Sequence, residues 1–162
     1  MRKPIIVGNW KMNKTMKETK EFMEAVDGVA ASDNATYGIG APYTALATAV
    51  AGAKNLIVAA ENCHFEDTGA FTGEVSVPML QEVGVTHCII GHSERRQMFG
   101  DTDETVNKKA KRLIDAGITP ILCIGETEAQ YDAGETEKVI REQLSGSLAN
   151  LCPKCVGNMV IA

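Results

Sequence analysis

Short apolar runs alternate with longer amphipathic stretches along the chain. The runs are nearly continuous and rich in Val, Ile and small residues, which is typical of strands buried on both faces of a parallel sheet. We predict five such strands, at residues 4–10, 36–42, 56–62, 86–92 and 119–125. A sixth run, at residues 155–162, begins like a further strand.

The intervening stretches carry apolar residues at helical spacing. In the first of them Met16, Thr19, Phe22, Met23 and Val26 share one predicted face. The basic cluster KKAKR, residues 108–112, falls on the polar face of another, where we expect solvated side chains. Helices are predicted at residues 15–30, 44–53, 78–83, 103–117 and 135–151, with one or two further turns after His92.

A strand followed by a helix, repeated five times, indicates βαβ units and a parallel α/β sheet. The even spacing fits either a (β/α) barrel or a doubly wound sheet. Because no linker, low-complexity tract or charge block divides the chain, we expect residues 1–162 to belong to one domain.

The amino-acid composition disfavours some classes of protein, namely those that bind nucleic acid or span a membrane. Hydrophobic residues make up 44% and charged residues 23% of the 162 residues, as in ordinary soluble globular proteins. The net charge of −5 disfavours a nucleic-acid partner, and no apolar run approaches the roughly 20 residues that span a bilayer. Five cysteines lack the density of a disulfide scaffold, so a cytoplasmic protein is the simplest interpretation.

Polar residues follow several predicted strands, at the sheet edge where parallel α/β folds gather their sites. Asn9 and Lys11 lie at the end of the first strand. The sequence GHSERR, residues 91–96, comes at the end of the fourth, directly after the apolar run 86–90, and such a charged cluster indicates a site rather than a requirement of folding. A helix that opens at Ser93 and Glu94 would place its positive end beside His92, keeping the imidazole neutral and able to donate to an oxyanion.

Each of these residues also has a plain structural explanation. A lone lysine such as Lys11 is commonly solvated, and a histidine such as His92 is commonly bonded to its own loop; their occurrence at neighbouring strand ends favours a site. Cys152 and Cys155 form a C-x-x-C pair, which occurs as half of a zinc site or as a redox pair. The pair lies away from the carboxyl ends of the strands, which favours no role.

Four motifs occur together in one order: VGNWKMN, AENCHFEDTGAFTGEVSVPML, CIIGHSERR and ILCIGET. With their spacing, they resemble the triosephosphate isomerase family over the whole chain. The resemblance implies a partial (β/α)8 TIM barrel that interconverts dihydroxyacetone phosphate and glyceraldehyde 3-phosphate in glycolysis and gluconeogenesis. It implies no cofactor and no metal.

The resemblance also implies roles for individual residues. Lys11 would hold the phosphate side of the substrate and stabilise charge during enolisation, and Asn9 would bind substrate and orient Lys11. His92 would be the neutral electrophile that polarises the carbonyl. Glu94 would pair with Lys11, and Ser93 would be a resting-state partner of the catalytic base.

Further residues would serve assembly and packing. Phe71 and Thr72 lie at the tip of a long loop, residues 66–76, which in the family reaches the site of a second copy of the chain. Thr72 would then lie near Asn9 and Glu94 of its neighbour. Cys123 would pack near the base in a structural role.

The base of the family is a glutamate a few residues beyond position 162, and a complete barrel has about 250 residues. We therefore expect five βα units with a sixth-strand stub, open sheet edges, and a complementary C-terminal barrel chain that supplies the base. Glu94 and Glu126 are weak substitutes for it. The alternative is an inactive truncated or engineered partial barrel that serves as a folding or assembly module.

Overall fold

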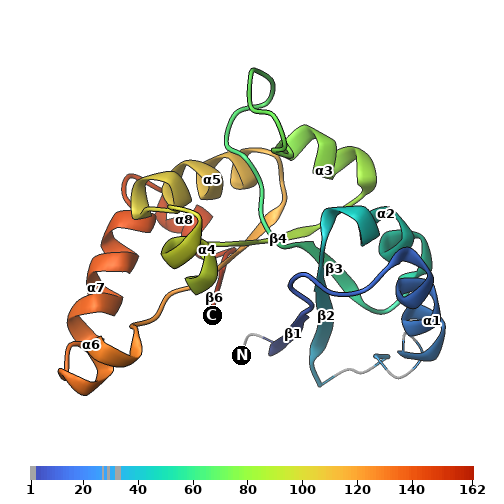
Figure 1. Cartoon of the computed structure of the whole chain (residues 1–162), viewed down its shortest axis with the longest axis horizontal. Coiled ribbons are helices and arrows are strands. Elements are labelled where there is room, and N and C mark those ends of the chain that lie inside the picture. The colour runs from blue at the N-terminus through green and yellow to red at the C-terminus, as the bar shows by residue number, and fades with distance from the viewer. Residues whose placement is uncertain (1–2, 27, 29, 32–33) are drawn as a thin grey trace.

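A computed structural model describes residues 3–26, 28, 30–31 and 34–162. Six parallel strands form one sheet in the order of the sequence, and the sheet curls into a half-barrel (Figure 1). The strands are β1 Ile5–Asn9, β2 Thr36–Ala41, β3 Ile57–Ala60, β4 His87–Ile90, β5 Thr119–Leu122 and β6 Val160–Ile161. The register pairs Ile39 with Val58, and Ile89 with Ile121, so the buried positions of neighbouring strands align.

Helices cover the convex face of the curled sheet (Figure 1). They are α1 Met16–Val26, α2 Tyr43–Gly52, α3 Val77–Val83, α4 Ser93–Met98, α5 Asp103–Asp115, α6 Glu128–Asp132, α7 Thr136–Ser147 and α8 Pro153–Val156. The main core lies between these helices and the sheet, with Leu46, Leu80, Ile90 and Leu113 almost fully buried. No helix in the described part of the chain has both the length and the apolar character to cross a membrane.

The predicted strands and long helices are present, with three differences. Residues 155–162 are not one strand: α8 precedes β6, because Pro153 suits the first turn of a helix. The short helix α6 was not predicted, although Thr127 and Gln130 form the capping box that marks its start. The helix predicted at 15–30 ends at Val26, and residues 27 and 29 lie outside the described part of the chain.

Burial on both faces holds for the inner strands but not for the edges. Ala59, Ile89 and Ile121 form a small cluster on the concave face. In contrast, Ile6 on β1 is 55% exposed and Ile161 on β6 is 44% exposed. Within the described chain each edge strand pairs with a neighbour on one side only. Among the described residues no further strand lies beyond it to cover its side chains on the concave face. The prediction of burial on both faces was therefore wrong for β1, and the exposure of β1 and β6 is that of the open sheet edges expected from the sequence.

Two expectations about helix faces were also wrong. Met16 was placed on the buried face of α1, but it is 62% exposed because it is the first residue of the helix, and the buried positions begin at Thr19. Lys109, in the cluster expected to be solvated, is only 3% exposed. Its ammonium group is buried because it has acceptors on two other segments, described below.

Candidate active site

The end of β1 holds Lys11 in an unusual backbone conformation. Its φ angle is +55°, in the left-handed region that residues other than glycine seldom adopt. The side chain of Asn9 supports this turn, because Oδ1 accepts a hydrogen bond of 3.0 Å from the backbone N of Lys11. Trp10, between them, packs edge-on against Phe22 of α1. Strain of this kind is commonly found at functional sites.

Lys11 and Glu94 form an ion pair between two strand ends. Lys11 Nζ lies 2.7 Å from Glu94 Oε1, and the side chains are 51% and 39% exposed. The hydrogen bond from Lys11 lowers the pKa of Glu94, assisted by the lysine charge. Glu94 is therefore an ionised partner of the lysine and a poor proton acceptor.

His92 caps the N-terminus of α4. Its Nδ1 accepts a hydrogen bond of 3.3 Å from the backbone N of Glu94. An imidazole nitrogen that accepts from an N–H carries no proton, so in the neutral ring the proton is on Nε2. Glu94 Oε2 lies 3.6 Å from Nδ1, too far for a hydrogen bond. The α4 N-terminus thus orients His92 with Nε2–H as the free donor.

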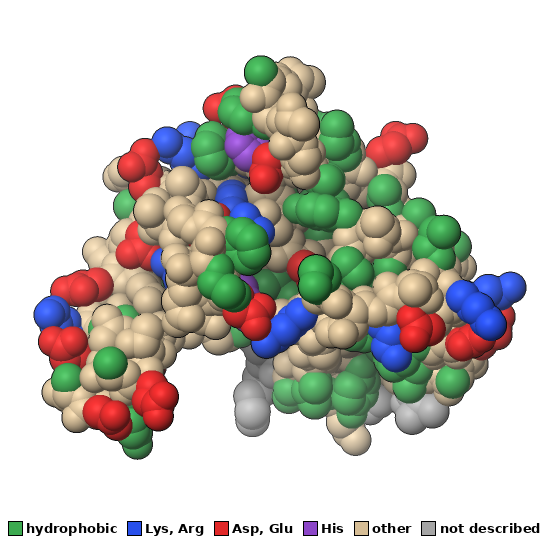
Figure 2. Space-filling view, in the orientation of Figure 1, with side chains coloured by type: hydrophobic (Ala, Val, Ile, Leu, Met, Phe, Trp, Pro, Cys, Tyr) green, Lys and Arg blue, Asp and Glu red, His purple; other side chains and the backbone are tan. Residues whose placement is uncertain are grey.

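A cavity of about 260 Å³ joins these residues at the carboxyl ends of β1, β3 and β4. Figure 2 shows charged side chains of both signs beside hydrophobic ones near the middle of this face. The polar lining can bind an anionic, oxygen-rich molecule, and the apolar lining can exclude water from part of it. The cavity is lined by Asn9, Lys11, Met12, Pro42, Tyr43, Glu61, Asn62, His92, Glu94, Arg95 and Phe99.

Glu61 is a cavity residue that the sequence analysis missed. Burial raises its pKa to about 7, against the lowering effect of a backbone hydrogen bond from Lys11, while the charge of Glu94 raises it further. Its Oε1 is buried and has no hydrogen-bond partner among the described residues. The signal was an acidic residue directly after the apolar run of β3, at the same edge as Asn9 and His92.

The two arginines of GHSERR have structural roles, which corrects the view that folding does not need this cluster. Arg96 Nε donates to the carbonyl oxygen of Gly91 at 2.8 Å, and its Nη1 lies 2.7 Å from Asp103 Oδ1. Gly91 has a φ of +68°, and a Cβ there would lie 3.0 Å from the Arg96 side chain. Arg95 pairs with Asp101 at 3.3 Å. These contacts fix α4, and thereby His92.

Asn62 is held from behind by the buried ammonium of Lys109. Lys109 Nζ donates to Asn62 Oδ1 at 2.9 Å and to Asp101 Oδ1 at 2.8 Å. The side chains of Lys109 and Asp101 are only 4% and 7% exposed. The second residue of KKAKR is therefore part of the wall behind the cavity.

The remaining predicted site residues lie outside this cavity. Ser93 is exposed at the start of α4. Cys123 packs against the concave cluster, and burial raises the pKa of its thiol. Glu126 accepts a hydrogen bond of 2.9 Å from Thr136, the first residue of α7.

The loop at residues 66–76 projects from the body of the chain, at the top of Figure 1. Thr72 is exposed at its tip. The ring of Phe71 is 43% exposed, with its centroid 4.2 Å from that of His64. The loop does not line the cavity of its own chain.

Comparison with known proteins gives a consistent result. Residues 4–162 match the family model for triosephosphate isomerase. The chain is 50% identical to triosephosphate isomerase of Acetivibrio thermocellus over 163 residues, and 47% identical to that of Alkaliphilus metalliredigens over 164. These alignments cover 99% and 100% of this chain, which spans only 65% and 66% of the two relatives.

A solved structure agrees with the fold. The crystal structure of triosephosphate isomerase from Bartonella henselae superposes with a TM-score of 0.90 at 36% sequence identity. The match covers 99% of this chain and 67% of that one.

Proposed function

Because this chain belongs to the triosephosphate isomerase family, we propose that it supplies the lysine and the histidine of a site that interconverts dihydroxyacetone phosphate and glyceraldehyde 3-phosphate. The observation that carries the proposal is the arrangement of Lys11, Glu94 and His92 around one cavity. The reaction moves a proton between adjacent carbons through an enediolate, so it needs a cation, a hydrogen-bond donor and a base.

Lys11 supplies the cation. Its side chain is half exposed, and the ammonium group pairs with one exposed carboxylate. It can therefore turn to an entering phosphodianion without breaking buried hydrogen bonds. Negative charge grows on the substrate oxygens as a carbon-bound proton is removed, and a fixed lysine lowers the energy of that state. Asn9 keeps the backbone of Lys11 in its strained turn and presents an amide to the same cavity.

His92 supplies the donor. Its Nε2–H bonds to the substrate carbonyl oxygen, and this bond strengthens as the oxygen becomes an enediolate oxygen. The proton can then pass from Nε2 to that oxygen and be replaced from the hydroxyl of the neighbouring carbon. The backbone N–H of Glu94 on Nδ1 keeps the ring in the tautomer that this step requires.

The base comes from polypeptide beyond these 162 residues, in this proposal from a separate C-terminal chain. Glu94 is engaged by Lys11, and Glu126 lies outside the cavity. Glu61 has the raised pKa of a general base, but its buried Oε1 belongs to the wall beside Lys11. The open edges of β1 and β6 and the exposed Ile6 support completion of the sheet by further strands.

We also propose a two-fold dimer in which each projecting loop enters the cavity of the other copy. Two features support it: Phe71 is an exposed aromatic at the loop tip, and Met12 and Phe99 add exposed apolar surface around the cavity. The unpartnered Oε1 of Glu61 is an acceptor for a donor from the neighbour's Thr72 region. Self-complementary loop and cavity are the arrangement that two-fold symmetry requires.

An isomerase assay tests the reaction. We expect no activity from the 162-residue chain alone, and activity when it is mixed with a chain that carries the remaining third of the Acetivibrio thermocellus relative. In that assembly His92→Gln should lower kcat more than it raises KM, because the donor acts in the transition state. Turnover by the isolated chain at the rate of the mixture would refute the proposed origin of the base.

A folded but inactive mixture would instead favour the alternative, in which the chain is a partial barrel that serves only in folding or assembly. Circular dichroism of the mixture separates this result from a failure of the two chains to fold together.

Sedimentation tests the dimer. Phe71→Glu combined with Thr72→Glu should halve the particle mass, because the charged tip loses the apolar contacts with Met12 and Phe99 and brings carboxylates toward Glu61 and Glu94. Met79→Glu is the matched control, since Met79 is 56% exposed on α3 and outside the loop. Equal sedimentation of the loop variant and the parent would show that this loop is not the interface.

A further inference from the structure

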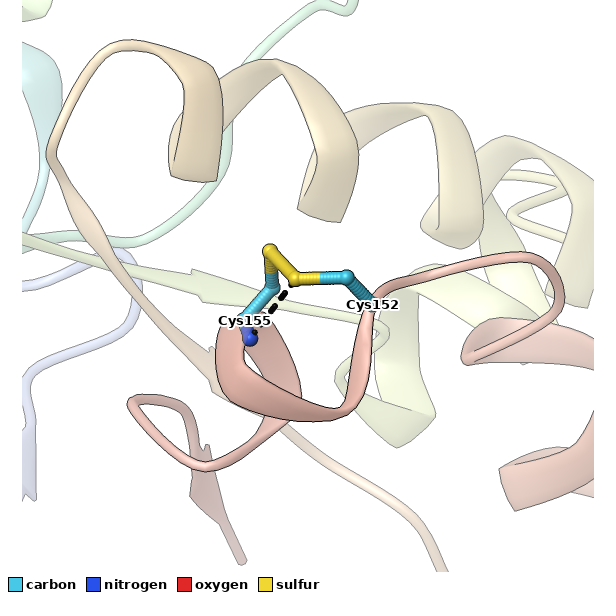
Figure 3. The surroundings of a disulfide bond; sticks show 2 residues. All are labelled: Cys152 and Cys155. Atoms are coloured by element: carbon cyan, nitrogen blue, oxygen red, sulfur yellow. Dashed lines mark hydrogen bonds between the residues drawn. A yellow bond between two sulfur atoms is a disulfide. The ribbon is translucent and has the colours of Figure 1, made fainter.

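The structure joins Cys152 and Cys155 by a disulfide across the single turn of α8 (Figure 3). Nothing in the proposed isomerase reaction uses this pair, and the sequence pattern favoured no role for it. Cys152 is exposed and Cys155 is half-buried. The free cysteines differ from them: Cys63 and Cys88 are buried, and the half-buried Cys123 lies on the concave side.

The surroundings of Cys152 suit a reactive sulfur. The backbone N of Cys155 donates to Cys152 Sγ at 3.0 Å, drawn as the dashed line in Figure 3. An N–H directed at sulfur stabilises a thiolate, as does the positive charge of the intervening Lys154. Pro153 lies in the first turn of α8, where its fixed φ favours the helical turn that directs this N–H at the sulfur.

The pair also has room for a reactant. It borders a cavity of about 520 Å³ whose lining includes Ile118, Thr119 and Pro120, at the start of β5. This is the opposite end of the sheet from Lys11 and His92, which follow the ends of their strands. A molecule that reaches the sulfurs therefore does not compete with the substrate cavity.

We propose that Cys152 and Cys155 form a reversible thiol–disulfide site that exchanges with dithiols, either small molecules or a protein of the C-x-x-C dithiol class. A thiolate of the reductant attacks Cys152 Sγ, the S–S bond breaks, and Cys155 leaves as a thiolate that takes up a proton. The second thiolate of the reductant then attacks the reductant sulfur of the mixed disulfide. The reductant closes into its own disulfide, and Cys152 is released as a thiolate that also takes up a proton. Two electrons and two protons thereby pass from the reductant to the pair, and the reverse steps oxidise it.

Thiol counting under native conditions tests the site. The folded, air-oxidised chain is treated with dithiothreitol, freed of it, and reacted with Ellman's reagent without denaturant. We expect two more reactive thiols per chain than before reduction, and their loss again in oxidised glutathione. The Cys152→Ser, Cys155→Ser double variant should show no such increase. Two thiols that stay reactive in oxidised glutathione, or a disulfide that resists dithiothreitol in the folded chain, would overturn the proposal.

Single variants test which sulfur is attacked. Cys155→Ser leaves Cys152 to form a mixed disulfide with oxidised glutathione, and Cys152→Ser leaves Cys155. By mass spectrometry we expect Cys152 to gain glutathione roughly tenfold faster, because it is more exposed and has the N–H donor. Equal rates, or a faster Cys155, would contradict the assigned direction of exchange. The result does not depend on isomerase activity.

Discussion

Two lysine–carboxylate pairs near the same end of the sheet have almost the same length and different surroundings. Lys109 lies 2.8 Å from Asp101, with the two side chains 4% and 7% exposed. Lys11 lies 2.7 Å from Glu94, with the side chains 51% and 39% exposed. The distance between charges therefore does not distinguish them, whereas access of water does.

The buried pair stabilises the fold, whereas the exposed pair leaves Lys11 free to bind a ligand. The buried ammonium of Lys109 also bonds Asn62, and Asp101 also bonds Arg95, so these charges are satisfied inside the protein. Removal of one buried partner leaves the other without compensation. The exposed pair is screened by solvent and contributes little to stability. Lys11 can therefore leave Glu94 for a ligand with little disturbance.

The largest expected effect follows from breaking the buried pair. Lys109→Met should reduce the free energy of unfolding by about 3 kcal/mol, because buried Asp101 then keeps only its longer contact with Arg95 and Asn62 loses its donor. Urea unfolding followed by circular dichroism measures the loss. Lys108→Met is the matched control, since Lys108 pairs with Glu104 on the exposed side of α5 and its removal should leave the midpoint unchanged.

The double variant Lys109→Met, Asp101→Asn separates the effect of the buried charge from the effect of losing the lysine side chain. It should be more stable than Lys109→Met alone, because the buried carboxylate that has lost its ammonium partner is replaced by a neutral amide. Destabilisation of the double variant by the sum of the two single losses would mean that packing of the lysine stem, and not charge, holds α5.

A smaller and pH-dependent effect is expected at Glu61, which lines the cavity with Lys11 and Glu94. Its pKa in the folded chain is about 7, against an ordinary value of 4.5. Between these values the folded state binds more protons than the unfolded state, so this group's contribution to stability falls as pH rises and the loss is complete above about pH 7. Glu61→Gln removes the ionisation and should stabilise the chain by about 1 to 2 kcal/mol at about pH 8, after allowance for solvent screening.

The measurement is urea unfolding of parent and Glu61→Gln at about pH 5 and about pH 8, the two sides of this ionisation. The gain should be much smaller at the lower pH. Equal gains at both would show that the amide improves a hydrogen bond and that the carboxylate charge is not the cause. Gln is the suitable replacement because it keeps the volume of the side chain.

The smallest effect on stability is expected for the exposed pair. Lys11→Met should leave the urea midpoint of the isolated chain unchanged, because the lysine is solvated and Glu94 returns to water. In the complemented assembly the same change should abolish isomerase activity, since the cation that faces the substrate is lost. A large shift of the midpoint would mean that Lys11 holds the turn after β1 and that its strained backbone is structural.

Local patterns were sufficient for most elements of the fold. Apolar runs marked β1 to β5, and apolar residues at helical spacing marked α5 and α7, because strand and helix periodicity depend on residues close together in the sequence. The same reasoning assigned residues 155–162 to one strand, since Val156 and Val160 are both apolar. Their separation into α8 and β6 follows from Pro153 and from the pairing of Val160 with Ile121.

In the candidate site, too, some features follow from the sequence and others only from the tertiary structure. The sequence by itself determined that Asn9, Lys11 and His92 follow parallel strands, and hence that they share one edge of the sheet, because parallel strands align their carboxyl ends. It also determined that His92 precedes a helix. Only the tertiary structure decided that Lys109 is buried behind Asn62 and that Glu61 lies in the cavity wall with its Oε1 unpartnered among the described residues. The reason is physical: burial and pKa depend on residues more than 40 positions away that share the same few ångströms, and no local pattern encodes that proximity.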